Sequence, residues 1–161
     1  MANLSRIVSV VQIKDVRLYE GTCRSFVRPS ESAENVVVQQ SHAHSILKSK
    51  TDELLIRVRF KLGVHEEGDE KKRQVEIRAT YELSYRVPSK KEFSDEEVDE
   101  FGRVNAVFNA WPYWREYVQG SLARMLMPSY TIPVFRVRRG DAPPGQNGKP
   151  PKKRRSPSPK R

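Results

Sequence analysis

Three histidines and one cysteine are the side chains of this sequence best suited to bind a metal ion. His42 and His44 lie two positions apart in SHAHS, so on a β-strand both would point to the same side. A zinc site needs at least three protein ligands, and His65 or Cys23 would have to approach the pair from distant parts of the chain. Polar strand residues are the simpler interpretation of the pair. We therefore expect no metal and no other cofactor.

Acidic side chains, which could act as general acids or bases, cluster at 66–70 and 95–100. The first cluster lies in a polar loop, and the second falls at a helix start, where the helix dipole favours negative charge. Neither resembles a pair of catalytic carboxylates. The motifs GxxxxGK(S/T), GxGxxG and GxSxG are absent from the sequence. These observations predict a protein that is not an enzyme.

The net charge of +10 is unevenly distributed along the chain. Residues 141–161, DAPPGQNGKPPKKRRSPSPKR, hold seven basic residues and one acidic residue, a net charge of +6, which leaves +4 for residues 1–140. This segment contains six prolines and no large apolar side chain, so it cannot bury enough surface to fold. We expect one domain over 1–140 and a disordered, basic, proline-rich tail over 141–161. Its KKRR cluster could contact nucleic acid by charge alone, or the tail could simply keep the protein soluble.

No apolar run approaches the roughly 20 residues that a helix needs to span a bilayer. The first residues, MANLSRIVSVVQIKD, also lack the continuous apolar block of a secretory signal. We expect a cytoplasmic protein without membrane insertion.

Two segments alternate between apolar and mostly polar residues, 54–64 (LLIRVRFKLGV) and 74–87 (QVEIRATYELSYRV). Such alternation predicts antiparallel strands with one buried face and one solvated face. The polar segment HEEGDEKKR between them suits a hairpin loop. On the solvated faces the pattern predicts cross-strand ion pairs among Arg57, Arg59, Lys61, Glu76, Arg78 and Glu82.

Two further strands are predicted at 6–19 and 35–47, with a long loop between them. The alternation of the first strand changes phase near Asp15, because Val11 and Ile13 share one parity while Val16 and Leu18 share the other. A β-bulge at Lys14–Asp15 would restore a single apolar face.

The apolar period then changes to that of a helix. Ser94 and Glu97 can form a capping box, with Phe93 and Val98 as the hydrophobic staple above it. A helical stripe runs on to Phe108, and Pro112 would begin a second helix whose stripe starts at Trp114. Pro128 and Pro133 predict an extended exit. Four strands followed by two helices predict an α+β fold, a four-stranded antiparallel sheet with two helices packed on one face.

The aromatic segment WPYWREYVQGSLARMLMP at 111–128, followed by the extended PSYTIPVF at 128–135, resembles the helix signature of the SecB export-chaperone family. The strand IKDVRL at 13–18 is similar to the first strand of that family, and the order of the elements also matches. The resemblance covers about residues 6–137. It implies an ATP-independent holdase that binds unfolded or precursor polypeptides in apolar grooves and delivers them to the motor protein SecA.

The family resemblance also implies roles for individual residues. It implies a homotetramer, a dimer of dimers, with Phe101, Val104 and Phe108 at the oligomer interface. The implied client groove consists of Val16, Leu18, Ile46, Trp111, Tyr113 and Tyr117, and the implied docking site for the motor consists of Asp15, Glu66 and Glu67. Trp114 begins the helical stripe, so we expect it in the core, whereas Trp111 and Tyr113 should border the groove.

Two features depart from the family pattern. The body of the chain is net positive, with Arg57, Arg59 and Arg78 on the predicted solvated face, whereas the docking face of SecA-dependent members is acidic. The basic tail also has no counterpart in the usual family tail. Two alternatives therefore stay open: a SecB-like chaperone that guards an antitoxin of a toxin–antitoxin system, and an adaptor that binds nucleic acid through its tail only.

Overall fold

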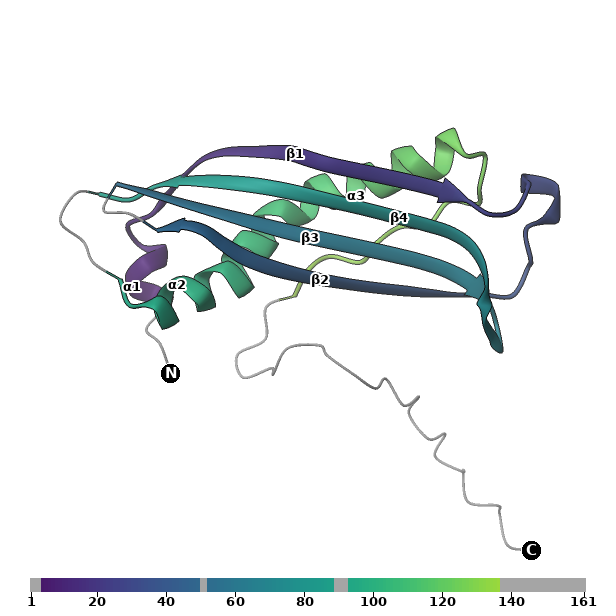
Figure 1. Ribbon diagram of the computed structural model, residues 1–161, viewed down its shortest axis with the longest axis horizontal. Helices are drawn as coiled ribbons and strands as arrows, with labels where there is room; N and C mark the ends of the chain where they lie inside the picture. The colour runs from purple at the N-terminus through teal and green to yellow at the C-terminus, as the bar shows by residue number, and fades with distance from the viewer. Residues whose placement is uncertain (1–3, 50–51, 89–92, 137–161) are drawn as a thin grey trace, which may run out of the picture.

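The computed structural model describes residues 4–49, 52–88 and 93–136 (Figure 1). The predicted boundary at residue 140 and the predicted disordered tail lie outside these residues. The described chain begins with a short helix, continues through four strands and ends in a helical layer with an extended exit. The elements in chain order are α1 (Leu4–Val8), β1 (Gln12–Ser25), the 3-10 turn η1 (Pro29–Glu31), β2 (Val36–Ser49), β3 (Glu53–Glu66), β4 (Asp69–Arg86), α2 (Asp95–Phe101), the π-helical segment η2 (Gly102–Ala106) and α3 (Val107–Arg124).

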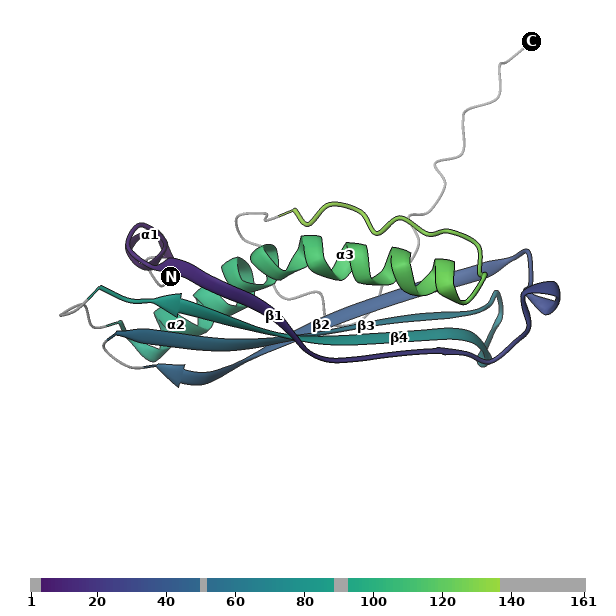
Figure 2. The ribbon, with the colours of Figure 1, turned by 90° about the horizontal axis from the view of Figure 1, so that it is seen from above.

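The four strands form one antiparallel sheet in the order β1-β4-β3-β2, so β1 and β2 are its two edges. All of the described helices lie on one face of this sheet, and α3 runs along it (Figure 2). We call this the inner face, and the opposite, uncovered one the outer face. This architecture confirms the predicted α+β fold with a four-stranded antiparallel sheet.

The core lies between the inner face and the helices. On β3 the buried residues alternate with more exposed ones, as the period-two pattern predicts. Trp114 stacks on Phe60 with ring centroids 5.3 Å apart, which fixes the middle of α3 against the sheet. Each fully buried side chain of this size contributes about 1.5–3 kcal/mol through removal from water. The largest of them are Trp114, Tyr85, Ile7, Leu54, Ile56, Leu62, Ile77, Leu83 and Ile132.

The N-terminal strand begins and ends later in the chain than the predicted range 6–19, since β1 covers Gln12–Ser25. Residues Leu4–Val8 form α1, and the strand begins only at Gln12. The apolar residue Ile7 caused the strand to be predicted too early. It is fully buried, but as part of a helix rather than a strand. The predicted bulge is confirmed, because the register between β1 and β4 shifts between Ile13 and Asp15.

The helical layer begins as predicted. The Ser94 side chain accepts a hydrogen bond from the Glu97 backbone N–H at 3.2 Å, and the Glu97 carboxylate accepts one from the Ser94 N–H at 3.0 Å. This reciprocal pair satisfies two backbone donors that the first turn leaves without helical partners.

The predicted break between two helices at Pro112 is wrong. The helical path runs from α2 through η2 into α3, and Pro112 lies inside α3 on its exposed side. A proline removes one helical hydrogen bond. An exposed position limits the cost, because the carbonyl released on that side can bind water. The irregular turn lies instead at Gly102, where a Cβ atom would come within 2.6 Å of His44 Cδ2.

After α3 the chain turns back and runs along the helix as the exit segment, residues 127–136 (Figure 2). Ile132 is buried, and the Trp111 indole Nε1–H donates to the Pro133 carbonyl at 2.8 Å. Phe135 packs on Trp111 with ring centroids 5.0 Å apart. The predicted extended exit is therefore present, and it covers one flank of α3.

Candidate functional site

The bulges of β1 determine which of its side chains face α3. Ile13 lies opposite Tyr85, Val16 opposite Leu83 and Leu18 opposite Tyr81. These β4 partners are buried on the inner face, so the three β1 side chains also point to that face. Without the shift after Ile13, the alternation would place Ile13 and Val16 on opposite faces.

The flank of α3 nearest β1 carries two tyrosines. The ring centroid of Tyr113 lies 6.2 Å from that of Tyr81, and the Tyr81 hydroxyl donates to the Tyr113 carbonyl at 3.0 Å. Burial raises the pKa of Tyr81, so its hydroxyl remains protonated and keeps donating. One turn later, Tyr117 lies against Gly21 of β1, where a Cβ atom would come within 2.8 Å of the Tyr117 ring.

Together these side chains form an apolar surface that we call the β1–α3 strip: Ile13, Val16, Leu18, Tyr113 and Tyr117. Ile13, Leu18 and Tyr113 are each 48% exposed, and Val16 and Tyr117 are half-buried. Aromatic and aliphatic side chains held this far into solvent by a rigid sheet and helix offer contact area without a large ordering cost. The strip can therefore bind apolar segments of another polypeptide.

Trp111 does not belong to this strip. It is only 9% exposed and lies on the other flank of α3, enclosed by Phe60, His42 and the exit segment. Its predicted place beside Tyr113 in an open groove is wrong in this structure, because residues 133–135 cover it. Trp114 is 1% exposed and belongs to the core, as expected.

Ile46 is also separated from the strip. It lies on β2, the edge opposite β1, where its Cδ1 atom approaches the position of a Cβ on Gly102 to 3.1 Å. Of the six predicted groove residues, the structure thus brings together Val16, Leu18, Tyr113 and Tyr117.

The three predicted interface residues occupy different environments. Phe101 is 3% exposed and packs edge-on against Tyr85 at 5.0 Å, so it is a core residue and cannot line an interface between subunits. Val104 is half-buried, and Phe108 is 53% exposed on α3. Of these three residues, only Phe108 offers a large exposed apolar side chain to a second subunit.

The predicted docking residues do not come together. Asp15 pairs with Ser84 near one end of β4, whereas Glu66 pairs with Asp69 at the hairpin that begins this strand, and Glu67 is in the same hairpin. At about 3.4 Å per residue these positions lie roughly 50 Å apart along the strand. The structure therefore does not form one acidic docking site from them.

The histidine pair faces the helical layer rather than a metal site. The Nε2 atom of His44 lies 2.9 Å from an Asp99 carboxylate oxygen. His42 packs against aromatic rings, and its pKa is lowered by burial and by the neighbouring His44. Cys23 is exposed on the edge strand. Within residues 4–49, 52–88 and 93–136, no group of three metal-binding side chains converges.

Sequence reasoning missed Ile13 and Gly21. The phase shift in β1 could have identified Ile13, since the bulge that re-aims Val16 and Leu18 leaves all three on one face. Nothing in the sequence indicates that a tyrosine of α3 packs over Gly21, because that contact depends on where the helix crosses the sheet.

Comparisons with known proteins identify the fold. No protein-family profile matches the sequence, and no curated protein is significantly similar to it. The structure is similar to that of the Mycobacterium tuberculosis SecB-like chaperone Rv1957, solved in complex with a ChAD peptide from the Rv1956 HigA1 antitoxin. The TM-score is 0.73 at 16% sequence identity, and the match covers 83% of this chain and 96% of that one.

A protein of unknown function from Streptococcus agalactiae matches with a TM-score of 0.42 at 8% identity, over 76% of this chain and 96% of that chain, which is too weak to indicate a shared fold. The chain thus has a SecB-like fold that carries an exposed apolar strip. Among the described helices, none is both long enough and apolar enough to cross a membrane.

Proposed function

We propose that this protein is an ATP-independent chaperone that holds non-native polypeptides on the β1–α3 strip. The observation that carries the proposal is the exposure of Ile13, Leu18 and Tyr113 beside one another on rigid elements. Several weak apolar contacts along one chain add up through effective concentration. Binding of this kind needs little sequence preference and no catalytic group.

The structural neighbour supports a particular client class. Rv1957 is a SecB-like chaperone and was solved with a peptide of an antitoxin. By analogy of fold, we propose an antitoxin or another labile polypeptide as the client of this chain. Delivery of precursors to a SecA-type export motor is the second candidate. We favour it less, because Asp15 lies far from Glu66 and Glu67 and the three do not form one docking site.

We further propose a cytoplasmic homotetramer that performs no catalysis. The exposed Phe108 on α3 and the free edge of β1 are two surfaces that we assign to subunit contacts. Nucleic-acid binding through the basic tail remains a separate proposal, motivated by the KKRR cluster alone.

The test is suppression of aggregation by the full chain. Denatured citrate synthase is diluted into buffer with or without a stoichiometric amount of the protein, and light scattering is recorded without ATP at low and moderate salt. We expect the protein to suppress scattering. Leu18→Ser and Tyr113→Ser should each weaken client binding by about tenfold, as expected when a contact at the centre of an interface is removed.

Leu47→Ser is the matched control, because Leu47 is 43% exposed but lies on the opposite edge strand. It should suppress aggregation as well as the unaltered protein. No suppression by the unaltered chain in either salt condition would contradict the proposal, as would equal losses in the control and in the strip variants.

A further inference from the structure

The outer face of the sheet carries carboxylates that lie beneath cations. The Glu82 side chain is only 5% exposed and forms ion pairs with both Arg17 and Arg57, which flank it on the neighbouring strands. Hydrogen bonds from Arg57 and Arg17 hold the pKa of Glu82 below its ordinary value against the opposing effect of burial. Arg17 is 67% exposed, so the cation rather than the carboxylate meets the solvent.

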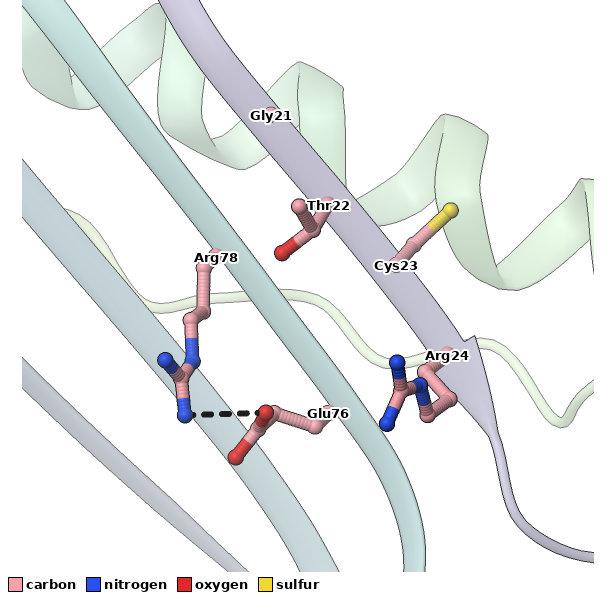
Figure 3. Close-up of a pocket in the computed structure, with 6 residues that line it drawn as sticks. All are labelled: Gly21, Thr22, Cys23, Arg24, Glu76 and Arg78. Carbon is pink, nitrogen blue, oxygen red and sulfur yellow. Dashed lines mark ion pairs between the residues drawn. The ribbon is translucent and has the colours of Figure 1, made fainter.

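Glu76, six residues before Glu82 in β4, has a similar arrangement. Its side chain is 16% exposed and lies 3.0 Å from Arg78 and 3.4 Å from both Lys61 and Arg73. Figure 3 shows Arg78 bridging to Glu76, with Arg24 of β1 on the other side of the carboxylate. Five cations thus share two largely buried carboxylates, and the surface between the strands presents positive charge.

Between these two clusters a hollow of about 460 Å³ crosses the sheet, which we call the outer furrow. All four strands contribute to it: short side chains come from Thr22, Ser41, Ala43 and Thr80, and cations from Arg59, Lys61 and Arg78. A second hollow of about 630 Å³ shares Thr22 and Arg78 with it and adds Arg24. Arg59 forms no ion pair within the described part of the chain and is exposed.

We propose that the outer furrow binds an acidic segment of a partner polypeptide, with Arg59, Lys61 and Arg78 holding its carboxylates. Four strands spaced about 4.8 Å apart give a furrow of roughly 14 Å, the length of about four extended residues. Guanidinium groups bind carboxylates with two parallel hydrogen bonds, and the short hydroxyl side chains on the floor can bind the peptide backbone.

Two features favour a polypeptide over a nucleic acid. Glu20 lies at the β1 end of the furrow and would repel a phosphate, which every nucleotide carries, whereas a peptide needs no acidic residue there. The exposed aromatic ring on β1, Tyr19, has the Arg57 guanidinium 4.0 Å from its centroid and a second cation, Arg17, at 5.8 Å, so it is not free for base stacking.

This site is separate from the β1–α3 strip, because it lies on the opposite face of the sheet. Its charge is the reverse of the acidic docking site predicted from Asp15, Glu66 and Glu67. A variant of the furrow should therefore leave suppression of aggregation unchanged, so the two proposals can fail independently.

The experiment uses the full chain with Lys152, Lys153, Arg154 and Arg155 replaced by Gln, which removes competition from the KKRR cluster. The probes are a fluorescein-labelled hexaglutamate peptide and an oligothymidylate of equal charge, and anisotropy is measured at low salt. Arg59→Glu should weaken hexaglutamate binding by at least about tenfold, since it places like charges together. Arg59→Gln should cause a smaller loss of affinity for hexaglutamate. Because this substitution is milder, it separates a loss of binding from a folding defect.

Arg28→Glu, in the loop between β1 and β2, is the matched control and should retain binding. The proposal is overturned if the parent chain does not bind hexaglutamate, or if both Arg59 variants bind it as the parent does. It is also overturned if the oligothymidylate binds more tightly and loses affinity in the same variants, because the furrow would then be a nucleic-acid site.

Discussion

Glu82 is the buried charge on which the outer face of the sheet depends. Its carboxylate accepts from Arg57 and Arg17, and removing the charge leaves both cations without their shared partner. We expect Glu82→Gln to lower the free energy of unfolding by about 1–3 kcal/mol at neutral pH, the usual cost of disrupting a charged hydrogen-bonded group. Urea denaturation of the two chains measures the difference.

The effect of Glu82→Gln should depend on pH. The pKa of Glu82 is lowered in the folded state, so its contribution is complete above the ordinary carboxyl pKa of about 4.3 and is lost as the pH falls through the lowered value. The two chains should therefore converge in stability in acid. Glu34→Gln, at an exposed loop carboxylate, is the control and should leave the free energy of unfolding at neutral pH unchanged. A difference in free energy of unfolding between the Glu82 variant and the parent that stays constant down to low pH would contradict this prediction.

At single positions, sequence reasoning succeeded where burial depends on local periodicity. Trp114 falls at the start of a helical stripe, and the structure buries it at 1% exposure. Trp111 was placed wrongly because its environment comes from residues 133–135, which the stripe does not include. The predicted cross-strand pairing of Glu82 with Arg57 is confirmed. The burial of Glu82 was not predicted, because it depends on Arg17 and Arg57 covering the carboxylate from the strands on both sides.

Among the elements, η2 is the irregular turn that joins α2 to α3. Gly102 lies at its start, where a Cβ atom would come within 2.6 Å of His44 Cδ2 and 3.1 Å of Ile46 Cδ1. Alanine favours helix over glycine by about 1 kcal/mol, but overpacking typically costs about 1–3 kcal/mol. We expect Gly102→Ala to destabilise the protein by about 1 kcal/mol, measured as a lower midpoint of thermal or urea unfolding.

Gly120→Ala is the matched control for Gly102→Ala. A Cβ atom at Gly120 of α3 would meet only mobile side-chain ends, chiefly Arg124 Nη1 at 3.0 Å. This substitution should therefore stabilise the protein by up to about 1 kcal/mol through helix propensity. The two substitutions should change the free energy of unfolding in opposite directions. Equal stabilisation by both would show that η2 has room for a side chain.

Alternation and capping signals identified the central strands and the helix start, because both depend on neighbouring residues. The π-helical segment and the continuous passage through Pro112 could not be predicted, since each depends on contacts with the sheet or with solvent. The N-terminal helix was missed for a related reason: five residues, Leu4–Val8, are too few to show a helical period.

For the whole molecule, we expect a tetramer of four 18.6 kDa chains in solution. Phe108 is exposed by 53% on the helical layer, so Phe108→Glu should weaken contacts made by that layer and reduce the mass to that of a dimer. Mass photometry or light scattering at micromolar concentration measures this. Leu47→Glu, on the β2 edge, serves as the control. A monomeric parent chain, or a loss of mass in the control alone, would contradict the expectation.

The global arrangement was accessible from the sequence because the order of strands and helices admits few topologies. The number of subunits and the identity of the partner polypeptides depend on which side chains lie together on the surface. The alternation of apolar and polar residues along the sequence does not predict this. The basic character of the outer face is an example, since it arises from carboxylates that are present in the sequence but buried beneath cations in the fold.

The placement of the two tryptophans has a practical consequence. Both are on α3, and one of them donates its indole N–H to the exit segment. Intrinsic fluorescence therefore reports on this segment without any label: lifting residues 133–135 would hydrate one indole and shift its emission to longer wavelength, while the other stays shielded as an internal reference. A spectroscopist could thus follow the detachment of the ten-residue exit segment in real time with the native chain.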